Sequence, residues 1–199
     1  LKRLGVSPEV FFNMYPRAVH RGGGQYSYEP LSHLRLLKGE YPKLGLTEGQ
    51  QALYTVIRNA NRYLYPGADK FLRRLKKGGL SLILVTHGNP QFQRLKLTHS
   101  GIKKYFDKVI FSSDVKVVTL KRLKKRFDEV FFISDHIREL AEVKHHLPEL
   151  LPIMKVGGHH SDIKKARRLK IPTLMTFREI ERLIMKHHNS SERKRKKIR

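Results

Sequence analysis

The feature that most constrains the fold is an alternation of short apolar runs with helical patterns of about ten residues, which starts after Tyr65–Gly67. The runs predict strands at Leu80–Val85, Lys108–Ser112, Glu129–Ser134, Leu151–Val156 and Thr173–Phe177. The segments that follow predict helices at Gln91–Ser100, Lys116–Arg126, Ile137–His146, Asp162–Leu169 and Arg178–Lys186, and Ala68–Lys77 predicts one before the first strand. Strands joined through helices imply parallel pairing and right-handed crossovers. The sequence therefore predicts an α/β fold with a Rossmann-like, doubly wound parallel sheet.

The residues before this alternation show helical patterns and no strand pattern. Ser7-Pro8-Glu9 is typical of a helix start, and Arg21–Tyr28, which contains three consecutive glycines, predicts a loop. Glu29–Leu37 and Thr47–Leu64 predict two further helices after this loop. We therefore expect three parts: a helical domain over residues 1–64, an α/β core over residues 65–186 and a basic, disordered tail over residues 187–199.

The net charge of +25 narrows the possible partners. Removing the basic residues of Arg193–Arg199 still leaves a strong positive excess, so the charge is not confined to the tail. One interpretation is contact with the phosphates of a nucleic acid. The other, which we favour here, is a surface tuned for solubility, because the lysines and arginines are spread over many helices without interleaved aromatic residues.

Polar residues follow two of the predicted strands. Thr86 comes after Leu80–Val85, where its hydroxyl could donate to a phosphoryl oxygen beside the backbone amides of His87 and Gly88. Asp135 comes after Glu129–Ser134, where a carboxylate suits Mg²⁺. Each residue could instead cap the helix that follows it.

Two further charged residues belong to this expected site. Lys116 begins a predicted helix and could pair with a phosphate or with a carboxylate. Glu139, four residues after Asp135, could be a second metal ligand, although its residue type and position favour a solvated surface charge. Thr86, Lys116 and Asp135 thus predict a phosphate and metal site at the carboxyl edge of the sheet.

The order of these segments resembles the haloacid dehalogenase-like hydrolase superfamily. The segment YPGADKFLRRLKKGGLSLILVTHGNPQFQRLKL is similar to the family's second motif, FDKVIFSSDVKVVTLKRL to its third and DEVFFISDHIRELAEVK to its fourth. In the third motif Lys116 is the best match and Lys121 the second choice; in the fourth, Asp135 matches the magnesium ligand. Ser134 departs from the pattern, because many relatives have a second aspartate there. The helical part over residues 1–64 is similar to the family's cap domain.

The resemblance implies a Mg²⁺-dependent phosphatase that acts on a small phosphomonoester through an aspartyl-phosphate intermediate. Thr86 and Lys116 would be catalytic and, with His87 and Gly88, would bind phosphate, while Asp135 and Glu139 would hold the metal. The family's first motif, a strand followed by Asp-x-Asp, is not found in the chain. We therefore expect the chain to be an N-terminally truncated fragment and to be inactive by itself. The alternative is a non-catalytic domain of the same fold that binds nucleic acid or another anionic partner.

The sequence also bears on membrane contact, the cellular compartment, substrate contacts and zinc binding. No apolar stretch approaches the ~20 residues that a membrane helix needs, so no membrane contact is expected. The absence of cysteine fits a reducing cytoplasm. Loop residues of the helical part could contact substrate; these candidates are Arg17, His20, Arg21 and Tyr26. Three pairs of adjacent histidines come without cysteine and do not by themselves indicate a zinc site; the pairs are His145-His146, His159-His160 and His187-His188.

Overall fold

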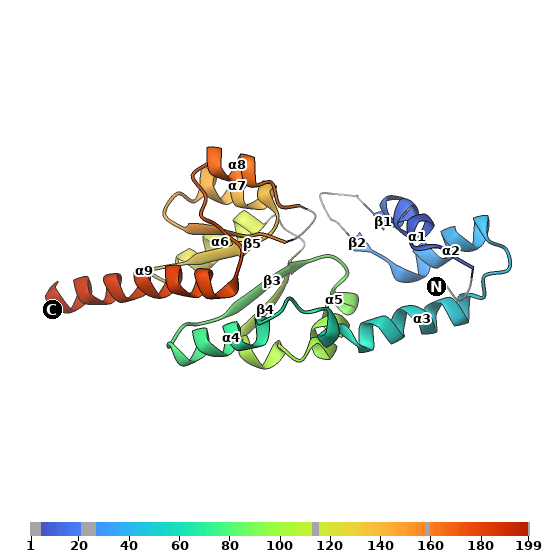
Figure 1. The fold of residues 1–199 in the computed structure, drawn as a ribbon, viewed down its shortest axis with the longest axis horizontal. Coiled ribbons are helices and arrows are strands. Elements are labelled where there is room, and N and C mark those ends of the chain that lie inside the picture. Colours follow the sequence, from blue (N-terminus) through green and yellow to red (C-terminus); the bar gives the residue numbers. More distant parts are fainter. Residues whose placement is uncertain (1–4, 21–26, 113–115, 158–159, 199) are drawn as a thin grey trace. The chain divides into compact units, whose positions relative to one another are not determined.

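The computed structural model describes residues 5–20, 27–112, 116–157 and 160–198 (Figure 1). The chain forms two compact units. The first comprises Leu1–Pro66 and Ser81–Asp114, and the second comprises Gly67–Leu80 and Val115–Arg199. These units differ from the expected division at Leu64, because the first strand of the α/β part and its crossover helix fall with the N-terminal helices.

The N-terminal part of the first unit is mostly helical, as the sequence predicts. Its elements are α1 (Pro8–Met14), η2 (Tyr15–Arg17), β1 (Val19–His20), β2 (Ser27–Tyr28), α2 (Pro30–Glu40), α3 (Leu46–Arg58) and η3 (Ala60–Tyr63). Ser7 caps α1 as expected, since its hydroxyl accepts a hydrogen bond from the Val10 N–H at 3.2 Å. The short antiparallel pair of β1 and β2 is new, because two-residue strands carry no readable periodicity. The predicted glycine loop lies mostly outside the described residues.

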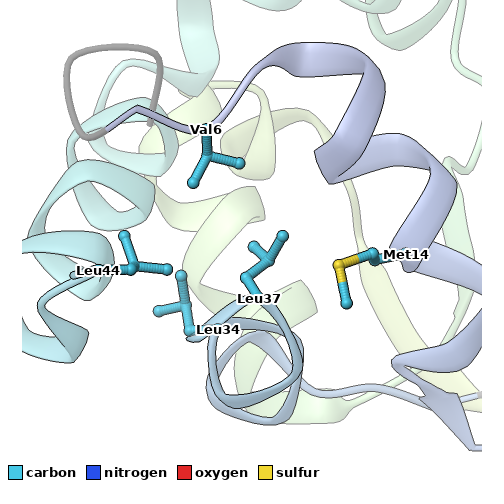
Figure 2. Close-up of a cluster of buried hydrophobic side chains, with 5 residues drawn as sticks. All are labelled: Val6, Met14, Leu34, Leu37 and Leu44. Atoms are coloured by element: carbon cyan, nitrogen blue, oxygen red, sulfur yellow. The ribbon is translucent and has the colours of Figure 1, made fainter. Parts of the chain in front are cut away.

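A cluster of buried apolar side chains holds these helices together. Figure 2 shows Leu34 and Leu37 of α2 among the other members; the cluster consists of Val6, Met14, Leu34, Leu37 and Leu44. Helix α3 approaches α2 closely at Gly49, where a Cβ atom would lie 2.9 Å from Leu34 Cδ2. A larger residue at position 49 would therefore force the Leu34 side chain to move.

Beside this cluster lies a fully buried histidine surrounded by aromatic rings. His33 of α2 has no exposed surface, and its Nδ1 shares a hydrogen bond of 3.0 Å with the Tyr28 hydroxyl. The ring of Phe11 lies 4.2 Å from the His33 ring, centroid to centroid. Burial lowers the pKa of His33, an effect that the Phe11 backbone partly offsets, and burial raises the pKa of Tyr28 to about 12. Both side chains are therefore neutral at pH 7 and act as a polar anchor within the apolar core.

The α/β part of the first unit is a two-stranded parallel sheet. Strand β3 (Ile83–His87) pairs with β4 (Lys108–Ser112), and α5 (Pro90–Ser100) and η4 (Lys103–Tyr105) form the crossover. Gly101 ends α5 in a left-handed conformation with φ of 74°, which explains the glycine at this position. Strand β4 has its predicted bounds, whereas β3 begins and ends later than the predicted Leu80–Val85.

The second unit contains a three-stranded parallel sheet in the order β5-β6-β7. Its elements are α4 (Ala68–Lys77), α6 (Lys116–Lys124), β5 (Phe131–Ser134), α7 (Ile137–His146), β6 (Leu151–Lys155), α8 (Ile163–Arg168), β7 (Thr173–Leu174) and α9 (Phe177–Ile198). The predicted α/β class with parallel strands is thus confirmed. Among the described residues, β3 and β5 each have a hydrogen-bonded neighbour on one edge only.

Helix α9 corrects the expectation of a disordered tail. The sequence predicts a helix that ends at Lys186, but α9 continues to Ile198. Its first turns pack on the unit through Ile180 and Ile184, which are 0% and 2% exposed. Lysine, arginine and glutamate are good helix formers, so a helix that packing has started can continue through this charged segment.

Candidate functional site

The end of β3 carries Thr86, which lies inside the strand rather than after it. Thr86 is paired with Phe111 in the β3–β4 register, and its side chain is half-buried. It does not cap α5, because the cap is Asn89, whose Oδ1 accepts a hydrogen bond from the Phe92 N–H at 3.0 Å. The capping interpretation of Thr86 is therefore wrong, and its hydroxyl remains a candidate donor at the strand end.

The turn after Thr86 is built by His87 and Gly88. Gly88 has φ of 109°, a conformation that favours glycine and lets the chain leave the strand toward α5. The His87 carbonyl accepts a hydrogen bond from Gln93 Nε2 at 3.0 Å. Within the described ranges His87 Nε2 is buried and has no hydrogen-bond partner. This nitrogen is a polar group that a ligand could satisfy.

In the second unit, three side chains meet where β5 ends. Lys116 Nζ donates to Glu139 Oε2 at 2.7 Å, and Ser134 Oγ donates to the same oxygen at 3.0 Å. The exposed fractions of the Lys116 and Glu139 side chains are 18% and 24%, so this is a largely buried ion pair. The interpretation of Glu139 as a solvated surface charge is therefore wrong. By contrast, Lys121, the second choice for the lysine, is exposed on α6.

Local sequence explains how this cluster forms. Lys116 begins α6 and Glu139 lies in the first turn of α7, where a carboxylate is favoured by the helix dipole. Ser134 is the last residue of β5, and its hydroxyl also accepts a hydrogen bond from the His136 N–H at 3.1 Å. The turn between β5 and α7 is thus fixed by the same serine that departs from the family pattern.

Asp135 lies in that turn, and its carboxylate is not used to cap α7. The helix begins after His136, and no side-chain hydrogen bond caps it. The Asp135 backbone carbonyl accepts a hydrogen bond from Ser161 Oγ at 3.3 Å. Within the part of the chain that the structure describes, no hydrogen bond or ion pair involves the Asp135 carboxylate. The helix-capping interpretation of Asp135 is wrong, and the half-buried carboxylate is available to a ligand.

The carboxylates fit a magnesium ion only in part. Asp135 offers oxygen atoms, which Mg²⁺ prefers, and this ion commonly takes one or two protein carboxylates with water and substrate phosphate. The Oε2 atom of Glu139 already accepts hydrogen bonds from Lys116 and Ser134, so Glu139 in this arrangement is not a free ligand. No group of three or more histidine or acidic residues that could hold a metal ion occurs among the described residues.

The predicted site residues thus fall in both units. Thr86, His87 and Gly88 belong to the first unit, and Lys116, Asp135 and Glu139 belong to the second. Within the second unit, Lys116 and Glu139 are in direct contact. The combination of both groups in one site stays a prediction.

Other contacts around Asp135 could not be found from the sequence. The rings of His136 and His160 stack with their centroids 4.6 Å apart, and the Ile137 N–H donates to the His160 carbonyl at 3.2 Å. These contacts and the Ser161 bond tie the loop after β6 to the turn after β5. The position of His160 after a predicted strand was the only signal in the sequence.

The expected substrate contacts of the N-terminal part receive little support. Arg17 is exposed and forms an ion pair with Glu40 at 3.2 Å. The side chain of His20 and the whole of Arg21 and Tyr26 lie outside the described residues, as does His159 of the second histidine pair. Within the described ranges, no helix is both long and apolar enough to span a bilayer.

Comparison with known proteins identifies the family. Residues 4–145 match the haloacid dehalogenase-like hydrolase family. The match covers well over half of the 199 residues. The chain therefore belongs to the haloacid dehalogenase-like hydrolases, as the motifs at Thr86, Lys116 and Asp135 predict.

A curated relative and two solved structures are similar to parts of the chain. A phosphoserine phosphatase from Thermus thermophilus is 41% identical over 62 residues, which is 31% of this chain and 25% of that protein. The chain therefore spans only a quarter of the length of this relative. A haloacid dehalogenase-like hydrolase from Burkholderia xenovorans LB400 has a TM-score of 0.62 at 20% identity, covering 86% of this chain and 78% of its own. A predicted phosphatase from Clostridium acetobutylicum has a TM-score of 0.54 at 16% identity, covering 81% and 79%. These structures confirm the Rossmann-like fold.

Proposed function

We propose that this chain is part of a phosphatase that hydrolyses a small phosphomonoester. The observation that carries the proposal is the cluster of Lys116, Glu139 and Ser134 at the carboxyl end of a parallel strand. It adjoins the Asp135 carboxylate, which no described residue pairs. That end of a strand is where α/β sheets bind ligands. The phosphatase activity named for the Thermus thermophilus relative supports the same class of substrate.

In this proposal, Lys116 neutralises a phosphoryl oxygen of the substrate. Its ammonium group is largely buried and already fixed by Glu139, so little reorganisation is needed when an anion arrives. The Thr86 hydroxyl donates to a second phosphoryl oxygen, and the backbone amides of His87 and Gly88 contribute further donors. These roles make electrostatic positioning a large part of the rate enhancement.

Asp135 is the proposed protein ligand of a magnesium ion. Its carboxylate fits this role because, among the described residues, no hydrogen bond or ion pair occupies it. Glu139 would hold Lys116 and Ser134 in place. It would become a second metal ligand only if its ion pair with Lys116 opened. When bound, Mg²⁺ would screen the negative charges of substrate and nucleophile.

The nucleophile of this reaction is proposed to lie on polypeptide outside these 199 residues. An aspartate oxygen would attack phosphorus, the alcohol would leave with the electron pair of the broken P–O bond and take up a proton, and water would then hydrolyse the acyl phosphate. The edges of β3 and β5 that no described strand pairs support this proposal, since a strand that carries such an aspartate needs a partner edge. The helices of residues 1–64 would form a cap that selects the substrate.

A paired activity assay tests the proposal. We expect the 199-residue chain to show no turnover of p-nitrophenyl phosphate with Mg²⁺, because it lacks an aspartate nucleophile in a strand-Asp-x-Asp context. A longer form of the protein that includes the sequence preceding Leu1 should hydrolyse the compound. Turnover by the 199-residue chain alone, or no turnover by the longer form at any Mg²⁺ concentration, would refute the proposal.

A further inference from the structure

Helix α9 presents a row of basic side chains on the face opposite its packing surface. Arg178, Arg182 and Lys186 are exposed and follow one another at intervals of four residues. Ile180 and Ile184, on the other side of the helix, are buried. Residues four apart lie on the same face of an α-helix, so the three cations form one line along the surface.

The register of α9 extends this line toward the C-terminal end. With 3.6 residues per turn, positions Arg193, Lys196 and Lys197 fall on the same face as the first three residues, within about 100° of the helix circumference. We call the six residues the α9 basic stripe. Its span from position 178 to position 197 corresponds to about 28 Å at the rise of an α-helix. In Figure 1 the last turns of α9 extend beyond the other elements of the second unit.

The acidic residues near the stripe with described side chains are engaged elsewhere. The Glu179 carboxylate accepts hydrogen bonds from the Met175 and Thr176 N–H groups at 3.0 and 2.7 Å, and these bonds, the Thr176 bonds above all, lower the pKa of Glu179. Glu181 forms an ion pair with Arg74 at 2.6 Å. Glu179 also interacts electrostatically with Arg182, but its hydrogen bonds hold its carboxylate at the start of α9, and the carboxylate of Glu181 is held by Arg74 of α4.

The residue types of the stripe and its surroundings indicate which class of anionic partner it could bind. An amphipathic helix that binds a membrane needs an apolar face to insert, but the apolar face of α9 is already packed on the unit, as the stacking of Phe177 on Phe71 at 4.8 Å shows. The stripe contains no aromatic residue on which unpaired bases could stack, as single-stranded nucleic acids require. A line of cations without base-reading side chains suits the phosphates of a duplex.

We propose that the α9 basic stripe binds the phosphate backbone of double-stranded DNA. B-DNA carries one negative charge per ~1.7 Å of its axis, so a duplex laid along the stripe presents phosphates over its whole length. The grooves of B-DNA also admit a helix, whereas the deep major groove of duplex RNA does not. The net charge of +25 favours the approach of any polyanion, and the stripe is the surface that we expect the DNA to contact. This inference does not depend on the proposed phosphatase activity.

Fluorescence anisotropy with a labelled DNA duplex tests the proposal. Neutralising six phosphates predicts a slope of about −5 for log K against log salt concentration. The triple variant Arg178→Gln, Arg182→Gln, Lys186→Gln should weaken binding about tenfold or more and reduce the magnitude of the slope by about 2 to 3. Glutamine keeps helix propensity close to that of arginine and lysine, and circular dichroism checks that α9 is retained.

A charge-matched triple variant in α8 is the control. Lys164, Arg167 and Arg168 are exposed in the same unit, and their replacement by glutamine removes the same charge. We expect this control to change affinity by about twofold or less. Equal weakening by both triples would overturn the proposal, since net charge alone would then explain binding. Preferential binding to duplex RNA, to single strands or to anionic lipid vesicles in parallel titrations would overturn it as well.

Discussion

Replacing Asp135 with asparagine should lower kcat/KM for p-nitrophenyl phosphate by about a thousandfold in a longer form of the protein that carries the proposed nucleophile. The expected loss follows from the role of the carboxylate, since an amide is a poor ligand for Mg²⁺ and brings no compensating charge. The Asp135 side chain makes no hydrogen bond or ion pair to described residues that the substitution could break. The loss should therefore appear in the rate at saturating substrate and not in stability, which steady-state kinetics and thermal unfolding measure separately.

Asp162→Asn is the matched control for this substitution. Asp162 is exposed and caps α8, where its Oδ1 accepts a hydrogen bond from the Lys165 N–H at 2.8 Å. Asparagine is also a good cap, so the free energy of unfolding should change by less than about 1 kcal/mol and the rate should stay the same. An equal loss of activity in both variants would contradict the proposed role of Asp135 as a magnesium ligand.

Leu34→Ala should have one of the largest effects on stability among single substitutions in the N-terminal helices. Leu34 has no exposed surface, and it lies in the cluster of Figure 2 against Gly49 of α3. Removing its side chain takes away buried apolar contacts and leaves a cavity that the helices can fill only in part. We expect the free energy of unfolding to fall by about 3 kcal/mol, measured by urea denaturation.

Leu31→Ala on the same helix is the control for this prediction. Leu31 is 37% exposed, so its truncation removes much less buried surface and should cost less than about 1 kcal/mol. Similar losses for both variants would mean that the Leu34 cluster does not hold α1, α2 and α3 together.

Sequence patterns predicted helices and strands best where a clear hydrophobic periodicity was followed by residues that end a helix or a strand. Helix α7 and strand β4 have their predicted bounds, and so does α4, which ends before Gly78. The pattern failed for β3, because an apolar run buried on both faces gives no register and the strand continues through the polar Thr86 and His87. It also failed for α9, where composition indicated disorder but packing at Ile180 and Ile184 starts a helix that then continues.

The sequence selects candidate site residues by type, but it does not give their geometry. Strand ends and a resemblance to the family select Lys116 and Asp135 as candidates, and their roles stay predictions. The shared contact of Lys116 and Ser134 with Glu139 depends on how α6, α7 and the end of β5 pack, which no local pattern encodes. The stack of His136 on His160 likewise joins segments that lie far apart in the sequence. The sequence therefore identifies candidate residues, whereas tertiary packing determines which of these residues are in contact.

The most direct test of the central claim compares two lysines on one helix. In a form of the protein that carries the proposed nucleophile, Lys116→Gln should lower kcat/KM by about a hundredfold or more, because a fixed cation would be lost from the phosphoryl group. Lys121→Gln, which changes an exposed residue of the same helix, should stay within about twofold of the unchanged protein. Full activity in the Lys116 variant, or an equal loss in the Lys121 variant, would contradict a phosphate site at the end of β5.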